Sequence, residues 1–189
     1  MVQTLIPNLV LIGYMGTGKS TIGRACARAL GFRAVDTDAH VERRCGRPIA
    51  DIFAADGEAE FRRMEALAVE EAAMRVNVVI ATGGGVVLNP GNVDTLRRSG
   101  VLMWLRVAPE EIVRRCGDPA SRPLLASAAD PLAKVKAMLT VREPLYSNAA
   151  DAIVETTGLR REDAATLVLD AYRRLAAAWP TVPGRDRRD

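Results

Sequence analysis

Short apolar runs alternate with amphipathic segments along most of the chain. The first run, residues 9–12, is uninterrupted, which is typical of a strand buried on both faces of a parallel sheet. The next segment, residues 21–30, has apolar side chains at helical spacing and is followed by Gly31, a residue type that often ends helices. The later strands are predicted at 32–35, 76–81, 101–107 and 152–155. The pattern therefore predicts a series of strands separated by helices.

The segments between the strands have the start and stop signals of helices. Pro90 stands at the first position of one predicted helix, and Gly100 follows its end. The predicted helices after the first are 39–45, 49–55, 57–75, 89–99, a short one from 109, 131–147 and 160–179. Strands that alternate with helices predict an α/β fold with a five-stranded parallel sheet flanked by helices. We expect one domain over 1–179 and a disordered tail over 180–189.

Composition narrows the class of protein. Of the 189 residues, 49% are hydrophobic and 26% charged, as in ordinary globular enzymes, and the apolar runs are too short to cross a membrane. Because the N-terminus does not resemble a signal peptide, we expect a cytoplasmic protein. The three cysteines lack metal-ligand spacing, which indicates reduced thiols. The net charge of +3 is small and aromatic residues make up 4%, so we expect no nucleic-acid partner, and the excess of arginine suits a small anionic substrate.

The first predicted strand runs into GYMGTGKS at residues 13–20, which matches the phosphate-binding loop pattern G-x-x-x-x-G-K-[ST]. Glycines allow successive N–H groups to point at one phosphate, and the following helix adds positive charge at its N-terminus. Lys19 can then reach the β- and γ-phosphates, and the Ser20 hydroxyl can ligate Mg²⁺. The alternative is a glycine-rich turn that matches by chance. Because strand, loop and helix occur in the expected order, we predict that the chain binds a nucleoside triphosphate.

Two carboxylates follow the second predicted strand. Asp36 and Asp38 stand at its carboxyl end, where ligands bind in open α/β sheets. We predict different roles for them: Asp36 holds Mg²⁺ through water, and Asp38 reaches a second substrate. The alternative is that they cap the helix predicted at 39–45. His40, the single histidine, is interpreted as a surface or core residue, because it has no partners at clear metal-ligand spacing.

Two further stretches have residues that can serve a ligand. In the helix at 57–75, Glu65 lies three residues after Arg62 and can hold its guanidinium, although helix geometry alone leaves Arg62 and Arg63 in solvent. Three glycines at 83–85 follow the third strand, and they allow either the close approach of a ligand or a plain turn.

The stretch from 114 to 125 is rich in glycine and proline and carries three arginines in or beside it. A loop with arginines over a phosphate site is a natural lid, and a solvent-exposed basic loop is the alternative. We place the predicted lid at about 115–127.

Six motifs occur in order along the chain: GYMGTGKST, DTD, GEAEFR, TGGG, RPLL and REPLY. Together they resemble the shikimate kinase family over residues 8–172, whereas a phosphate loop alone would indicate only a superfamily. The resemblance implies a three-layer P-loop kinase fold with a lid and a small substrate-binding subdomain near 36–64. It also implies ATP-dependent phosphorylation of the 3-hydroxyl of shikimate with one Mg²⁺ per subunit, and we expect a monomer.

The resemblance also implies roles for single residues. Asp38 is similar to the residue that hydrogen-bonds the 3-hydroxyl, and Arg122 to a lid residue that faces the transferred phosphate. Arg62, braced by Glu65, and Arg142 resemble the pair that holds the shikimate carboxylate. The implied catalytic residues are Lys19, Asp38 and Arg122; the implied ATP contacts are Gly16, Thr17, Gly18, Lys19, Ser20, Thr21, Arg115 and Arg122; the implied substrate contacts are Asp38, Arg62, Gly83, Gly84, Gly85 and Arg142; the implied metal contacts are Ser20 and Asp36.

Arg115 resembles the residue that packs on adenine, whereas the loop at 155–158 lacks the basic residues expected of the family and receives no role. Three other functions stay open. Another small-metabolite kinase, such as gluconate kinase, is not expected to carry both the glycine run and Arg142. A ligand-sensing domain is disfavoured because no helix-turn-helix precedes residue 5 and both Lys19 and Asp38 are intact. A nucleic-acid-dependent ATPase would need a longer chain and a basic groove.

Overall fold

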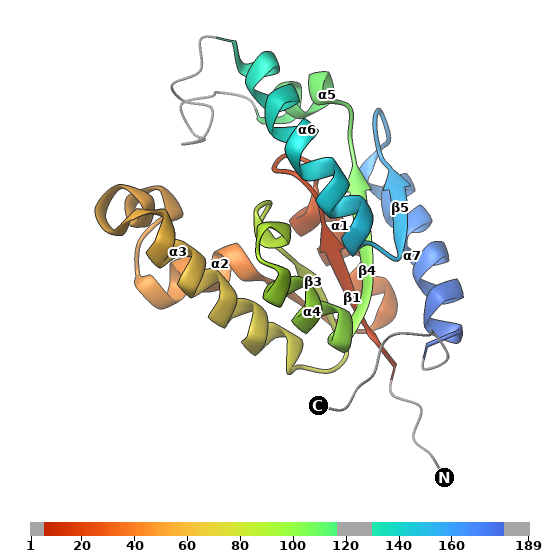
Figure 1. Cartoon of the computed structure of the whole chain (residues 1–189). Helices are drawn as coiled ribbons and strands as arrows, with labels where there is room; N and C mark the ends of the chain where they lie inside the picture. The colour runs from red at the N-terminus through yellow and green to blue at the C-terminus, as the bar shows by residue number, and fades with distance from the viewer. Residues whose placement is uncertain (1–5, 117–129, 180–189) are drawn as a thin grey trace.

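Five parallel strands form the central sheet of the computed structural model, which describes residues 6–116 and 130–179 (Figure 1). Their order across the sheet is β2-β3-β1-β4-β5. The strands are β1 (Asn8–Ile12), β2 (Arg33–Asp36), β3 (Val78–Ala81), β4 (Gly100–Arg106) and β5 (Ala152–Glu155). Since β1 pairs with both β3 and β4, the strand that leads into the phosphate loop lies at the centre of the sheet. The predicted parallel α/β fold is confirmed.

Helices cover both faces of this sheet and make it the middle of three layers (Figure 1). They are α1 (Lys19–Leu30), α2 (Thr37–Cys45), α3 (Ile49–Ala73), α4 (Pro90–Ser99), α5 (Pro109–Cys116), α6 (Pro131–Ala149) and α7 (Arg161–Ala177), with a 3-10 helix, η1, at Val86–Leu88. In β1, Leu9 and Leu11 pack with α1 and α7, whereas Val10 and Ile12 belong to the core under α3 to α6. This alternation is the two-residue period expected of a strand buried on both faces.

Helices α2 and α3 extend beside the sheet and have a small apolar cluster of their own (Figure 1). The cluster consists of Val41, Ile52, Phe61 and Ala68. The sequence predicted two helices here, at 49–55 and 57–75, and the structure has a single run with a kink between them. Gly57 has a φ of 83°, a left-handed conformation that glycine adopts readily and that bends the helix.

The start of the sheet depends on a polar side chain that the apolar pattern did not include. The Asn8 side chain accepts a hydrogen bond from the Val78 N–H at 3.1 Å and donates one to the Arg75 carbonyl at 2.7 Å. Asn77, just before β3, has a φ of 55°. The predicted strand at 76–81 therefore begins two residues later, at Val78, and the amide of Asn8 joins the first strand to the chain that enters the third.

Two predictions fall on parts of the chain outside the described residues. These parts are 117–129, with Arg122 and most of the predicted lid, and 180–189, the predicted tail. Among the helices that the structure describes, none combines the length and apolar character needed to cross a membrane.

Candidate active site

The phosphate loop connects the carboxyl end of β1 with the N-terminus of α1. Its glycines Gly13, Gly16 and Gly18 have φ values of 140°, 75° and 90°, which L side chains rarely adopt. Gly18 is the N-cap, and α1 begins at Lys19, two residues before the predicted start. The loop therefore turns tightly enough to bring the helix N-terminus, with its partial positive charge, to the edge of the sheet.

Lys19 is folded back over this loop and is 8% exposed. Its Nζ donates hydrogen bonds to the carbonyls of Gly13 at 2.7 Å and Tyr14 at 2.8 Å. The Thr17 hydroxyl donates to the same Tyr14 carbonyl at 2.8 Å, so Thr17 shapes the loop from within. Two backbone carbonyls of the loop thus fix the position of the lysine ammonium.

One cavity of about 630 Å³ opens beside the loop. Its walls come from the phosphate loop, α2, α3, the glycine run after β3, and α6. The predicted residues that line it are Gly16, Gly18, Lys19, Ser20, Thr21, Asp36, Asp38, Arg62, Gly83, Gly84, Gly85 and Arg142. Thr17 and Arg115 are not among its lining residues. The structure thus brings together side chains that lie up to about 125 residues apart in sequence.

Asp36 and Asp38 separate, as the turn from β2 into α2 predicts. Asp36 is the N-cap of α2, and its Oδ1 accepts a hydrogen bond from the Ala39 N–H at 3.0 Å. The capping alternative therefore describes Asp36, which also lines the cavity. Between the two, the buried Thr37 hydroxyl accepts a hydrogen bond from the Gly83 N–H at 3.1 Å, a contact that the sequence did not predict.

Asp38 lies in the first turn of α2, and its Oδ1 is buried without a hydrogen-bond partner among the described residues. Burial raises the pKa of this carboxyl to about 6. The positive charge of Lys19 acts in the opposite direction. The carboxylates that raise the pKa of Asp38 further are Asp36, Glu65 and Glu42. A carboxyl with a pKa near neutrality can exchange a proton with a bound hydroxyl.

Arg62 is held from two sides by carboxylates of α3. Its Nη1 donates to Glu65 Oε2 at 2.8 Å, and its Nη2 donates to Glu58 Oε1 at 3.0 Å. The side chain of Glu65 is 1% exposed, whereas that of Glu58 is 64% exposed. The guanidinium carbon also lies 5.3 Å from the centroid of the Phe61 ring. The predicted bracing by Glu65 is present, and the sequence missed Glu58.

The glycine run is explained by side chains that lie over its bare backbone. A Cβ on Gly83 would come within 2.5 Å of Asp38 Oδ1 and 2.7 Å of Glu65 Oε1. A Cβ on Gly85 would collide with the guanidinium of Arg62. None of these three glycines has a positive φ, so conformation is not the reason for them. At Gly83 and Gly85 the space that a side chain would fill is taken by Asp38, Glu65 and Arg62, whereas at Gly84 a Cβ would lie 3.2 Å from the backbone nitrogen of Met15.

Helix α6 holds the middle glycine from the other side. The Tyr146 hydroxyl donates a hydrogen bond to the Gly84 carbonyl at 2.5 Å, and its ring is stacked with Trp104 at a centroid distance of 5.6 Å. Burial raises the pKa of Tyr146, which keeps its hydroxyl a donor. Arg142, one helical turn earlier, is 9% exposed and reaches the same cavity. A tyrosine in the REPLY motif could have suggested this support, but its partner could not be predicted.

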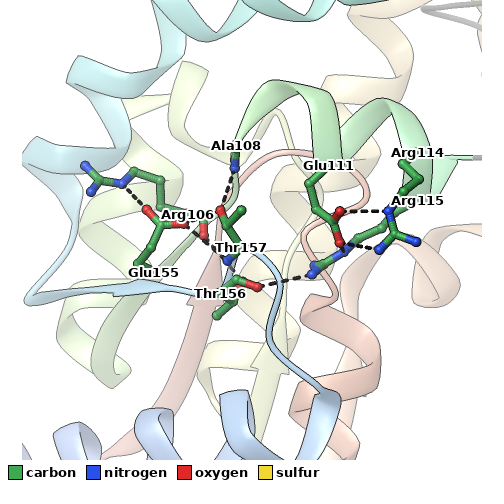
Figure 2. Close-up of polar contacts among 8 residues, drawn as sticks. All are labelled: Arg106, Ala108, Glu111, Arg114, Arg115, Glu155, Thr156 and Thr157. Carbon is green, nitrogen blue, oxygen red and sulfur yellow. Dashed lines mark hydrogen bonds and ion pairs between the residues drawn. The ribbon is translucent and has the colours of Figure 1, made fainter.

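Arg115 lies apart from this cavity, near the loop that follows β5 (Figure 2). Its Nε donates to Glu111 Oε1 at 2.7 Å, and its Nη2 donates to the Thr156 carbonyl at 3.1 Å. The Ala108 N–H donates to the Thr157 hydroxyl at 2.8 Å. Both ends of α5 are therefore joined to the loop after β5 by hydrogen bonds that involve side chains. The predicted contact of Arg115 with adenine stays a prediction.

His40 is a link between two helices. Its Nε2 lies 2.7 Å from Glu71 Oε2 of α3, and Arg44 of α2 pairs with the same carboxylate. His40 does not line the cavity beside the phosphate loop. The interpretation of His40 as neither a base nor a metal ligand is compatible with this position, although the sequence did not indicate its partner.

Known proteins are similar to this chain in both sequence and structure. The profile of the family described as Shikimate kinase matches residues 15–173. A shikimate kinase of Caldanaerobacter subterraneus subsp. tengcongensis is 44% identical over 168 residues, which cover 89% of this chain and 97% of the relative. The solved structure of shikimate kinase from Acinetobacter baumannii in complex with shikimate has a TM-score of 0.87 and 34% identity, covering 91% of this chain and 96% of the other.

A gluconokinase from Sinorhizobium meliloti 1021 has a TM-score of 0.55 and is 19% identical, over 92% of this chain and 95% of the other. That similarity shows a shared fold alone. The family match, in contrast, runs from within the phosphate loop into α7 and includes the glycine run and Arg142. The chain belongs to the shikimate kinase family.

Proposed function

We propose that this protein transfers the γ-phosphate of ATP to the 3-hydroxyl of shikimate, giving shikimate 3-phosphate and ADP in the biosynthesis of chorismate and aromatic amino acids. One observation carries the proposal: a phosphate-binding loop and a set of groups suited to a hydroxylated carboxylate line the same cavity. Lys19 belongs to the phosphate-binding loop, and Asp38 and Arg62 belong to the groups that suit the acceptor. Donor and acceptor would thus meet in one space that protein surrounds.

On the nucleotide side, the loop supplies positive charge where the transferred phosphate carries negative charge. The Lys19 ammonium would leave its two loop carbonyls and move to the β- and γ-phosphates. Backbone N–H groups at the start of α1 would bind the remaining phosphate oxygens. Phosphoryl transfer depends chiefly on such positioning and charge stabilisation.

On the acceptor side, Asp38 would accept the hydrogen bond of the 3-hydroxyl and direct its oxygen at the γ-phosphorus. As the bond between that oxygen and phosphorus forms, the bond from phosphorus to the bridging oxygen of ADP breaks, and the hydroxyl proton passes to Asp38. Arg62 and Arg142 would hold the substrate carboxylate, because guanidinium groups match the two oxygens of a carboxylate. Arg142 is buried and Arg62 is half-buried in the cavity wall, which strengthens that contact.

Mg²⁺ fits the donors of this site. Ser20 offers a hydroxyl, and Asp36 offers the carboxylate oxygen that does not cap α2. In the described ranges, no group of three or more His, Cys, Asp or Glu side chains could hold a metal ion by itself. This donor set suits Mg²⁺, which binds few protein oxygens and is otherwise held by substrate phosphates and water. The ion supplies positive charge at the β- and γ-phosphates when it is bound.

The remaining expectations stay predictions. Arg122 lies outside the described residues, and its proposed place beside the transferred phosphate rests on the RPLL motif. The adenine contact of Arg115, a monomeric state and a cytoplasmic location rest on the same resemblance and on composition.

Release of ADP with and without shikimate tests the function directly. A coupled assay should show ADP release that requires shikimate and that gluconate does not replace. Lys19→Ala should lower kcat by about 100-fold or more, while Lys136→Ala, an exposed lysine on α6, should leave it unchanged. Release that is independent of shikimate, or that gluconate supports, would overturn the proposed function.

The carboxylate site has its own test. Arg62→Lys and Arg142→Lys keep the charge but lose the paired donors of the guanidinium, so KM for shikimate should rise more than KM for ATP. If ATP were affected instead, these arginines would belong to the nucleotide side.

A further inference from the structure

Tyr14 is a residue of the phosphate loop whose side chain turns away from the nucleotide side. It is 1% exposed and is not among the residues that line the cavity. The Arg142 guanidinium carbon lies over its ring, 5.6 Å from the centroid. The Tyr14 hydroxyl donates a hydrogen bond to Met138 Sδ at 3.1 Å, and Met138 lies one turn before Arg142 on α6. One aromatic side chain thus contacts this helix at two points.

Arg142 and Arg62 are supported in different ways. Arg62 pairs with two carboxylates, whereas Arg142, within the described part of the chain, pairs with none. The surroundings of Arg142 are aromatic: the face of Tyr14 lies beneath it, and Tyr146 lies within hydrogen-bonding reach. An aromatic face stabilises a buried cation without supplying an anion. Arg142 therefore has no ion pair of its own among the described residues and depends on these aromatic contacts together with the electrostatic attraction of the Glu65 carboxylate.

The backbone of Tyr14 contacts Lys19, the residue proposed to bind the phosphates of ATP. Its carbonyl accepts the hydrogen bonds from Lys19 and from Thr17, each at 2.8 Å. In the proposed move of Lys19 to a phosphate, this carbonyl would lose the hydrogen bond from Lys19. The residue that supports Arg142 through its ring is therefore also the residue from which Lys19 departs.

We propose that Tyr14 is a positioning residue, whose ring holds Arg142 toward the carboxylate of the acceptor and links that arginine to the phosphate loop. This inference rests on the proposed role of Arg142 in binding the substrate carboxylate. It adds a physical connection between the two halves of the cavity. A change at the loop carbonyl that moves Tyr14 would also change the position of Arg142. By thermodynamic linkage, a ligand that moves Arg142 would change the binding of phosphate at the loop by the same factor.

Steady-state kinetics of two variants distinguish the contribution of the Tyr14 ring from that of its hydroxyl. Tyr14→Leu removes the aromatic face and should raise KM for shikimate by about tenfold, with KM for ATP unchanged. Tyr14→Phe keeps the face and loses only the hydrogen bond to Met138, so its KM for shikimate should stay close to that of the wild type. Met138→Leu is the matched control for that hydrogen bond. Equal effects on both substrates would mean that Tyr14 is only a core residue.

A double-mutant cycle with Arg142→Lys tests whether Tyr14 acts through Arg142. The effects of Tyr14→Leu and Arg142→Lys on KM for shikimate should be less than additive, because both remove the same contact. Additive effects would overturn the inference while leaving the proposed function intact. If Arg142→Lys alone had no effect on KM for shikimate, the role of Arg142 and this inference would both fail.

If Tyr14→Leu does not fold, phenylalanine analogues with increasing ring fluorination at position 14 provide the same test at nearly constant volume. Each fluorine weakens the negative face of the ring. KM for shikimate should then rise step by step, with the melting temperature nearly unchanged. A flat series would overturn the inference.

Discussion

The carboxylates of Asp38 and Glu65 meet over the bare backbone of Gly83, although they come from different helices. Each leaves one oxygen buried without a hydrogen-bond partner among the described residues. These oxygens lie 2.5 and 2.7 Å from the position that a Cβ of Gly83 would occupy. Two carboxylates in so small a space disfavour each other's ionised form. Burial is the main reason that the pKa of Asp38 is raised, and Glu65 adds to it together with Asp36, so a proton is held more tightly at Asp38 than at an ordinary aspartate.

The pH dependence of turnover should follow the ionisation of the Asp38 carboxyl. Its pKa of about 6 lies well above the ordinary value of 3.8. In the proposed mechanism only the ionised form can accept the hydroxyl proton. Accordingly, kcat/KM for shikimate should fall about tenfold for each pH unit below 6. Asp38→Asn should lower kcat by about 100-fold or more and remove this acidic limb. A limb that persists in the variant with the same midpoint would belong to another group.

Stability should change with pH in the opposite sense to activity. Between the unfolded pKa of 3.8 and the folded pKa of about 6, Asp38 binds more proton when the protein is folded. Its contribution to the free energy of unfolding therefore falls as pH rises through this window and stays low above it. Asp38→Asn should be more stable than the wild type at pH 8 by up to about 3 kcal/mol, and this advantage should disappear near pH 3. Thermal melts at the two pH values measure it; a variant that melts earlier at pH 8 would show that the carboxylate makes a net stabilising contact.

The two carboxylates on Arg62 form a matched pair for mutagenesis. Glu65→Gln removes a buried charge and should raise KM for shikimate by about tenfold with little change in KM for ATP. Glu58→Gln touches the same guanidinium from an exposed position, where ion pairs contribute little, and should change KM by less than about twofold. Equal effects of the two variants would mean that Arg62 needs no fixed position.

Adding a single methyl group to the glycine run should be enough to stop turnover. In Gly83→Ala the new Cβ must displace Asp38 or Glu65, and a shift of that size should lower kcat by about 100-fold or more. Gly91→Ala is the control, since its Cβ would approach only the Asn89 side chain, at 3.2 Å, and alanine suits its place in α4. Normal turnover in Gly83→Ala would contradict the packing described for this site.

Arg114 and Arg115 both pair with Glu111, but they differ in their other contacts and in their exposure (Figure 2). Arg115 also binds the Thr156 carbonyl and has a side chain 23% exposed, whereas that of Arg114 is 73% exposed. Arg115→Ala should raise KM for ATP by about tenfold and leave KM for shikimate unchanged. Arg114→Ala should change neither. If both variants behaved like the wild type, adenine would be bound elsewhere.

Local sequence patterns were enough to predict the α/β fold. The uninterrupted apolar runs predicted the strands because strands of a parallel sheet are buried on both faces. Apart from the kinked run α3 and the unpredicted η1, the differences lie at the ends of elements, and these have physical causes. Asn8 extends β1 through its amide, and the left-handed Asn77 delays the start of β3. Neither cause is visible in a pattern of hydrophobic and polar residues.

The site was predicted as a set of residues but not as a set of contacts. The position after the second strand indicated Asp38, and the resemblance to the shikimate kinase family implied Arg62; the cavity is lined by both. The reason for the glycines could not be derived, because it lies in side chains from α2 and α3 that reach them through the fold. The same holds for the Tyr146 hydrogen bond to Gly84, which spans 62 residues of sequence. Such partners are set by tertiary packing rather than by local spacing.

The crowded space over the glycine run has a consequence for inhibitors of this enzyme. A compound that contacts the backbone of Gly83 and Gly85 would bind a surface that cannot be changed by substitution without disturbing the active site. Any substitution there would add a Cβ and push Asp38, Glu65 or Arg62 out of place. The change that weakened the inhibitor would then also remove turnover. Drug resistance would have to arise at more distant positions, where its effect on binding is smaller.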